Sequence, residues 1–85
     1  MTLSRLRIKI DKVDNLLIKT LAQREKIVQK IAKIKKKQYL PIINKKREQE
    51  IYNQLKKKAK MYHLEEKYLL QLFKLIIRYS RKIQK

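Results

Sequence analysis

The sequence predicts an all-α fold with three helices, one long and two shorter. Glycine is absent from the 85 residues and proline occurs once, so few residues interrupt a helix. Apolar residues recur at steps of three and four, as on a helix with one buried face, and little of the chain alternates like a half-buried strand. The length suits one small domain, which we expect to span residues 1–85.

The first helix is expected over residues 3–37, a stretch without a helix-breaking residue. At about 1.5 Å per residue it is roughly 50 Å long, whereas two partner helices of about 18–20 residues span only ~30 Å. The uncovered part of its apolar stripe must therefore pack against another chain, and an antiparallel second copy is the simplest partner. The stripe consists of Leu6, Ile10, Val13, Leu17, Leu21, Val28 and Ile31.

The second helix is expected over residues 44–61. Asn44 is a favourable N-cap residue, and Pro41 keeps the preceding link out of the helical conformation. One face of this helix carries Ile51, Leu55 and Ala59.

The third helix is expected over residues 64–84. Glu65 and Glu66 lie in its first turn, where the helix dipole favours acidic side chains. His63 precedes it in the turn, where we expect a solvated or capping role. The residues expected to face inward are Leu69, Leu72, Phe73, Ile76 and Ile77.

The composition favours some classes of function over others. A net charge of +18 suggests nucleic acid or an anionic membrane surface. However, 19 of the 25 cations are lysine in a chain also rich in Ile, Gln and Tyr, so a solvated lysine surface is the simpler interpretation. Without cysteine, and with one histidine, we expect no disulfide and no metal site. With no membrane span and no signal peptide, we expect a cytoplasmic protein.

The inner faces of the helices become polar over part of their length. Arg24 and Lys35 lie within about 20° of the centre of the first stripe. Glu48 shares a face with Ile51 and Leu55, and the stripe of the third helix continues into Ser80 and Gln84. Buried charges need partners, and the inward cations outnumber the single inward carboxylate. Either an external anion completes the set, or these residues form structural ion pairs at the ends of the bundle.

Arg7 gives a geometric clue to the assembly. It precedes Arg24 by 17 residues, which is about 25 Å along the helix, so the two side chains of one chain cannot share a small site. In an antiparallel dimer, Arg7 of one chain can approach Arg24 and Lys35 of the other. Arginine in a chain that mostly uses lysine is itself informative, because its rigid fork suits carboxylate binding.

Four segments, in order, are similar to the all-helical class of chorismate mutases over residues 6–84. They are LRIKIDKVDNLLIKTLAQR, KIKKK, LPIINKKREQEI and FKLIIRYSRKIQ. The resemblance implies an intertwined six-helix homodimer with two active sites built from both subunits. It also implies the rearrangement of chorismate to prephenate in phenylalanine and tyrosine biosynthesis, with no cofactor.

Position by position, the resemblance implies roles for the inward polar residues. Arg24 and the partner subunit's Arg7 would hold the two carboxylates of chorismate, a dianion. Lys35 would contact a carboxylate and the ether oxygen of the breaking bond. Ser80 would bind a carboxylate, and Gln84 would donate a hydrogen bond to the ether oxygen.

The resemblance assigns the remaining positions to the second helix and to the apolar walls. Glu48 would accept a hydrogen bond from the ring hydroxyl, and Arg47 would support the site beside it. Asn44 stands where the family commonly has an aspartate, so a negative charge near the ring hydroxyl is missing. The apolar walls would be Ile31, Ile51 and Ile77.

Three alternatives remain. An isochorismate pyruvate-lyase of the same fold uses a similar cationic pocket, although the Arg47–Glu48 pair and the loop length favour the mutase. A basic helical nucleic-acid-binding module would need its cations on an outer face, which does not explain the inward Arg24 and Lys35. A purely structural dimer is the third. We expect no specific nucleic-acid partner.

Overall fold

The computed structural model describes residues 1–85 as three helices without strands. These are α1 (Leu3–Lys37), α2 (Lys45–Met61) and α3 (Glu66–Ile83). The prediction of an all-α chain whose first helix is the longest is confirmed. The third helix begins two residues later than expected because Glu65 is its N-cap.

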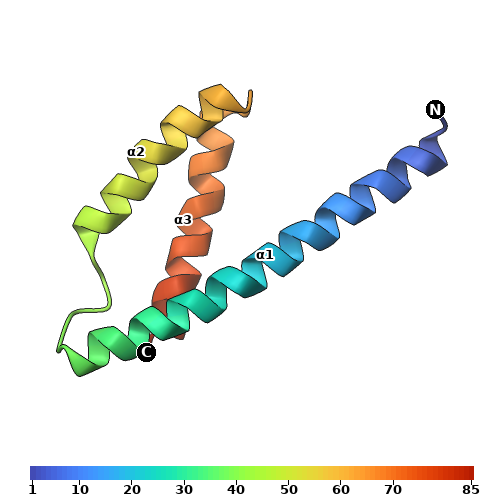
Figure 1. The fold of residues 1–85 in the computed structure, drawn as a ribbon. Helices are drawn as coiled ribbons and strands as arrows, with labels where there is room; N and C mark the ends of the chain where they lie inside the picture. The colour runs from blue at the N-terminus through green and yellow to red at the C-terminus, as the bar shows by residue number, and fades with distance from the viewer.

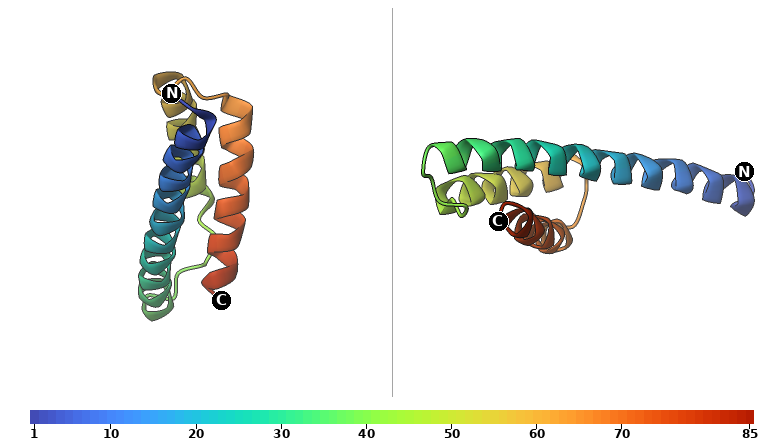
Figure 2. Two further views of the ribbon diagram at one scale, coloured as in Figure 1. Left: turned by 90° about the vertical axis from the view of Figure 1, so that its right-hand side faces the viewer. Right: turned by 90° about the horizontal axis from the view of Figure 1, so that it is seen from below.

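Two of the helices form a hairpin that lies beside one half of the long helix α1 (Figures 1 and 2). α2 and α3 form the hairpin, and α3 packs against the C-terminal half of α1. α1 and α2 do not pack directly against each other. The N-terminal half of α1 projects away from the hairpin without a neighbour (Figure 2).

Side-chain caps fix the starts of α1 and α2. The Thr2 hydroxyl accepts a hydrogen bond from the Arg5 amide at 3.2 Å. Asn44 Oδ1 accepts one from the Arg47 amide at 3.0 Å, as expected of an N-cap residue. The cap at Asn44 sets where α2 begins, and therefore which of its residues face α3.

Both α1 and α2 end in a left-handed residue although the chain contains no glycine. Tyr39 follows α1 and His63 follows α2, each with φ of 56°. After α2, the Leu64 amide donates to the Ala59 carbonyl at 2.9 Å, which completes a Schellman motif. A side chain in this region costs about 1–2 kcal/mol because its Cβ approaches the carbonyl oxygen.

We expect His63→Gly to stabilise the fold. Glycine removes the Cβ contact but gains freedom in the unfolded chain, so the net increase in unfolding free energy is about 0.5–1 kcal/mol. Denaturant unfolding at fixed protein concentration measures this. His63→Ala is the matched control, since it keeps the Cβ and should gain nothing. Equal stabilisation by both variants would contradict the assignment to backbone conformation.

The buried core of the single chain is very small. Only five residues are buried, and they come from the faces on which α3 packs against α2 and α1: Val28, Leu55, Ala59, Ile77 and Ser80. Leu55, Ala59 and Ile77 were expected to face inward, and they do. Leu72 was expected inward too, but it is 38% exposed.

The apolar stripe of α1 is largely uncovered. Of its seven residues only Val28 is buried, and Leu6 to Leu21 of the stripe are 44–58% exposed. The radius of gyration is 16.1 Å, whereas a compact chain of this length has about 12 Å. None of the helices is long and apolar enough to span a bilayer. The length argument made from the sequence, that α2 and α3 cannot cover α1, is confirmed by these exposures.

Candidate active site

A pocket of about 370 Å³ lies where all three helices and the α1–α2 loop converge. Ten of the eleven site residues predicted from the sequence line it, and Arg7 is the exception. The ten are Arg24, Ile31, Lys35, Asn44, Arg47, Glu48, Ile51, Ile77, Ser80 and Gln84. The structure therefore brings together, from three helices, side chains up to 60 residues apart in sequence.

α1 contributes two half-buried cations to the pocket, Arg24 and Lys35. Arg24 donates a hydrogen bond to the Ser80 hydroxyl, and burial lowers the pKa of its guanidinium. Arginine nevertheless stays protonated in proteins, so this charge is permanent. The Lys35 ammonium donates to the Ile42 carbonyl at 2.6 Å and to Gln84 Oε1 at 2.9 Å. Neither cation has an acidic partner.

The C-terminal turn of α3 provides the polar floor of the pocket. Ser80 is buried, and its hydroxyl donates to the Ile76 carbonyl at 2.9 Å while accepting from Arg24. Gln84 Nε2 donates to the Ser80 carbonyl at 3.1 Å. An amide nitrogen carries two N–H groups, so one donor of Gln84 remains for a ligand. Lys35, with three donors and two partners, also keeps one.

The only carboxylate in the pocket, Glu48, is paired with Arg81 of α3. Arg81 Nε donates to Glu48 Oε2 at 2.9 Å, and its terminal nitrogen donates to Oε1. These hydrogen bonds raise the pKa of the Arg81 guanidinium. The sequence reasoning missed Arg81. Its signal was its place four residues after Ile77 and next to Ser80, on the edge of the inward face.

Arg47 and Asn44 lie at the rim of the pocket, at the start of α2. Arg47, expected beside Glu48, instead donates to Glu50 Oε2 at 3.3 Å, and the side chains of this pair are 64% and 53% exposed. The side-chain oxygen of Asn44 accepts the hydrogen bond that caps α2. Both residues still line the pocket, but neither supports the Glu48 carboxylate.

The apolar part of the pocket comes from all three helices. Ile77 is buried, Ile51 is half-buried and Ile31 is 43% exposed. Ile27, Val28 and Ile42 extend the same surface. A ligand that fills this pocket thus meets both apolar side chains and cations.

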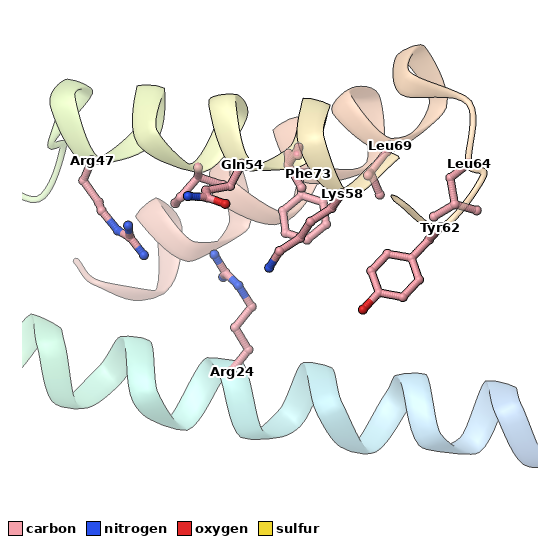
Figure 3. Close-up of a pocket in the computed structure, with 10 residues that line it drawn as sticks. Arg24, Arg47, Gln54, Lys58, Tyr62, Leu64, Leu69 and Phe73 are labelled. Carbon is pink, nitrogen blue, oxygen red and sulfur yellow. The ribbon is translucent and has the colours of Figure 1, made fainter. Parts of the chain in front are cut away.

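A second pocket, of about 410 Å³, continues from the first along the gap between α1 and α2. The two pockets share Arg24, Arg47 and Ile51. Figure 3 shows Arg24 reaching across the gap from α1, with Arg47 and Lys58 pointing towards it from α2. No acidic side chain lines this second pocket. Arg24 thus stands where the first pocket meets this second pocket, which forms a groove that also carries Arg47 and Lys58.

The balance of charge in the first pocket defines what it can bind. Four cations line it and only one carboxylate, which Arg81 neutralises. No group of three His, Cys, Asp or Glu side chains is placed to hold a metal ion. The remaining donors of Arg24, Lys35 and Gln84 point to an anion with hydrogen-bond acceptors as the ligand.

Comparison with known proteins agrees with this chemistry. The family described as chorismate mutase type II matches residues 6–85. A chorismate mutase from Methanocaldococcus jannaschii is 31% identical over 83 residues, which cover 98% of this chain and 84% of that protein. The match extends over α1, α2 and α3, including every residue of the pocket. The chain belongs to the type II, all-helical family of chorismate mutases.

Proposed function

We propose that the pocket of this chain binds chorismate and catalyses its rearrangement to prephenate. Family membership makes the chain an isomerase of aromatic amino-acid biosynthesis. The observation that carries the proposal is the pair of inward cations, Arg24 and Lys35. Neither has an acidic partner, and the only carboxylate of the pocket is already neutralised. Two cations without acidic partners suit a ligand with two negative charges, and chorismate carries two carboxylates.

In the proposed complex, cations hold the two carboxylates of the substrate. Arg24 binds one of them, and its bond to the Ser80 hydroxyl places Ser80 within reach of the same group. Lys35 binds the other through the donor that Ile42 and Gln84 leave free, and shares that donor with the ether oxygen of the breaking bond. Arg7, which lies on the projecting half of α1, joins Arg24 from the second subunit. Arg47 and the cap residue Asn44 border the entrance.

Catalysis follows from holding and polarising the substrate. The rearrangement is intramolecular, so the site needs no nucleophile and no general base. Ile31, Ile51 and Ile77 confine the ring and its side chain to the compact conformer in which the reacting atoms meet. The ether oxygen gains negative charge as its bond breaks, and the spare donors of Lys35 and Gln84 are aimed at that charge. Glu48 accepts a hydrogen bond from the ring hydroxyl.

We propose that the working unit is an intertwined homodimer. The accessible surface of the chain is 7988 Å², about 2,600 Å² above that of a folded monomer of this mass. An excess of this size is comparable with the area that one subunit buries in an obligate dimer. A second copy of α1, antiparallel to the first, would cover the exposed stripe. It would also bring its Arg7 to the groove in which Arg24 stands (Figure 3).

The proposed activity is tested by following chorismate loss and identifying the product by nuclear magnetic resonance. We expect prephenate at a rate proportional to enzyme concentration. Lys35→Ala, purified in parallel, should lose about 10²–10³ in rate, which separates the activity from a host contaminant. Pyruvate released from isochorismate, without prephenate from chorismate, would instead identify the lyase of the same fold.

A further inference from the structure

Glu48 and Arg81 form a two-point ion pair between α2 and α3 at the edge of the pocket. Two nitrogens of Arg81 each bind a different oxygen of the carboxylate. The side chain of Glu48 is only 15% exposed and that of Arg81 38% exposed, so the pair is partly shielded from water. A planar fork that meets a planar carboxylate at two points fixes its position and its orientation together.

No other cation of the pocket performs this task. Arg47 precedes Glu48 in the sequence but turns to a different carboxylate at the surface. Arg24 is held by a hydroxyl, and Lys35 by a carbonyl and an amide oxygen. None of these three forms an ion pair with Glu48. Arg81 alone determines where this carboxylate lies.

We propose that Arg81 is a positioning residue that holds the Glu48 carboxylate in place for the hydroxyl group of the substrate. A carboxylate offers about four acceptor positions, and the fork of Arg81 occupies two of them. The other two stay open on a group that lines the pocket. The inference rests on the proposed function, in which Glu48 receives the ring hydroxyl.

The same pair sets the charge that the substrate meets. Without Arg81, Glu48 would be a partly buried, unpaired carboxylate among Arg24 and Lys35, and it would be drawn towards them. With Arg81 in place, its charge is compensated on α3 and the two α1 cations stay available. Arg81 therefore contributes through Glu48 and does not itself contact the substrate.

The experiment compares Arg81→Met, which keeps an unbranched stem but loses the fork, with the parent enzyme. We expect kcat to fall about 10–100-fold with KM changed by less than about 3-fold, because a misplaced group weakens the transition state more than binding. Arg81→Lys should recover part of kcat, since it keeps the charge but not the two-point contact. Arg78→Met is the matched control on the same helix, and it should leave both constants within about 2-fold.

The deciding measurement is a double-mutant cycle with Glu48→Gln. If Arg81 acts only through Glu48, adding Arg81→Met to Glu48→Gln should cost less than about 2-fold in kcat. A full additional loss in that background would show direct contact with the substrate and overturn the proposal. So would an Arg81→Met variant that is less stable but as active as the parent, because the pair would then be structural only.

Two further results separate this proposal from the function on which it rests. If Arg81→Met does not fold, as judged by circular dichroism, Arg81→Lys takes its place in the cycle with the same criteria. A parent chain that forms no prephenate would refute the proposed function and this role with it. An active parent whose losses multiply in the cycle would refute only the role of Arg81.

Discussion

Chains with Arg7→Ala and chains with Arg24→Ala should each be nearly inactive, and a mixture of the two should recover about a quarter of the parent activity. Each change removes a cation that binds a substrate carboxylate, which should cost about 10²–10³ in kcat/KM. Random exchange makes about half of the dimers mixed. In a mixed dimer one site has both arginines and the other has neither.

The expected recovery depends on Arg7 and Arg24 of different chains meeting in one site. In the single chain they are 17 residues apart on one straight helix, about 25 Å, and only Arg24 lines the pocket. If Arg7 served its own chain, no site in a mixed dimer would be intact and activity would not recover.

The measurement needs proof that subunits exchange and that each variant is dimeric. Mass spectrometry of differently tagged chains establishes exchange, and sedimentation equilibrium at micromolar concentration establishes the dimer. The matched control is a mixture of two preparations of Arg24→Ala, which should recover no activity. A mixture of Arg7→Ala with Arg47→Ala does not serve as a control, because Arg47 lies at the rim of the pocket. A folded, helical monomer observed by sedimentation would contradict the proposal that each site is built from two chains.

The sequence was sufficient to predict the helices and several inward polar residues because helical periodicity is local, and the family resemblance supplied the rest of the pocket. Residues 11 apart, such as Arg24 and Lys35, share a face whatever the helix packs against. Their departure from an apolar stripe therefore indicates inward charges that need a partner, and the resemblance to the chorismate mutases assigns them to the site. The same reasoning, with the lengths of the three helices, predicted that much of α1 would stay uncovered.

What the sequence could not predict was which charges pair across helices. Arg81 lies four residues after Ile77 and about 100° around the helix from Ser80, at the edge of the inward face, where the pattern alone does not decide between solvent and a partner on another helix. Only the packing of α2 against α3 shows that its fork reaches Glu48. In the same way Arg47, next to Glu48 in sequence, turns to Glu50 because residues three apart on a helix are neighbours and adjacent ones are not.

The sequence also did not predict the backbone conformation of the turns that follow α1 and α2. A left-handed residue after a helix is usually glycine. Because this chain has no glycine, nothing in the sequence indicates that Tyr39 and His63 adopt this conformation. Their conformation is imposed by the Schellman hydrogen bonds that end α1 and α2. The three helices could still be predicted, because Pro41 indicates a break before α2 and the acidic pair Glu65 and Glu66 indicates the start of α3.

Gln84→Glu should leave the protein folded, lower kcat by about 10²–10³ near neutral pH, and make activity increase as the pH falls. In the parent, Gln84 Oε1 accepts from Lys35 at 2.9 Å and its nitrogen side keeps one free donor. The introduced carboxyl has no donor when ionised. It would also neutralise Lys35, the other donor aimed at the ether oxygen.

The sign of the pH effect follows from the protonation of that carboxyl group. An unperturbed glutamate is mostly ionised above about pH 4.3, and the neighbouring Lys35 favours the ionised form further, so a donor exists only on the acid side. The arginines that line the same pocket, Arg24, Arg47 and Arg81, are permanent cations. Glu48 and Lys35 are common to the parent and both variants, so comparison with Gln84→Ala isolates the effect of the introduced carboxyl group. The matched control is Gln84→Ala, which should lose a similar factor without gaining activity in acid. Rates from pH 5 to 8, measured with each variant shown to be folded, give both profiles. A Gln84→Glu variant as active at pH 8 as the parent would show that Gln84 does not face the breaking bond.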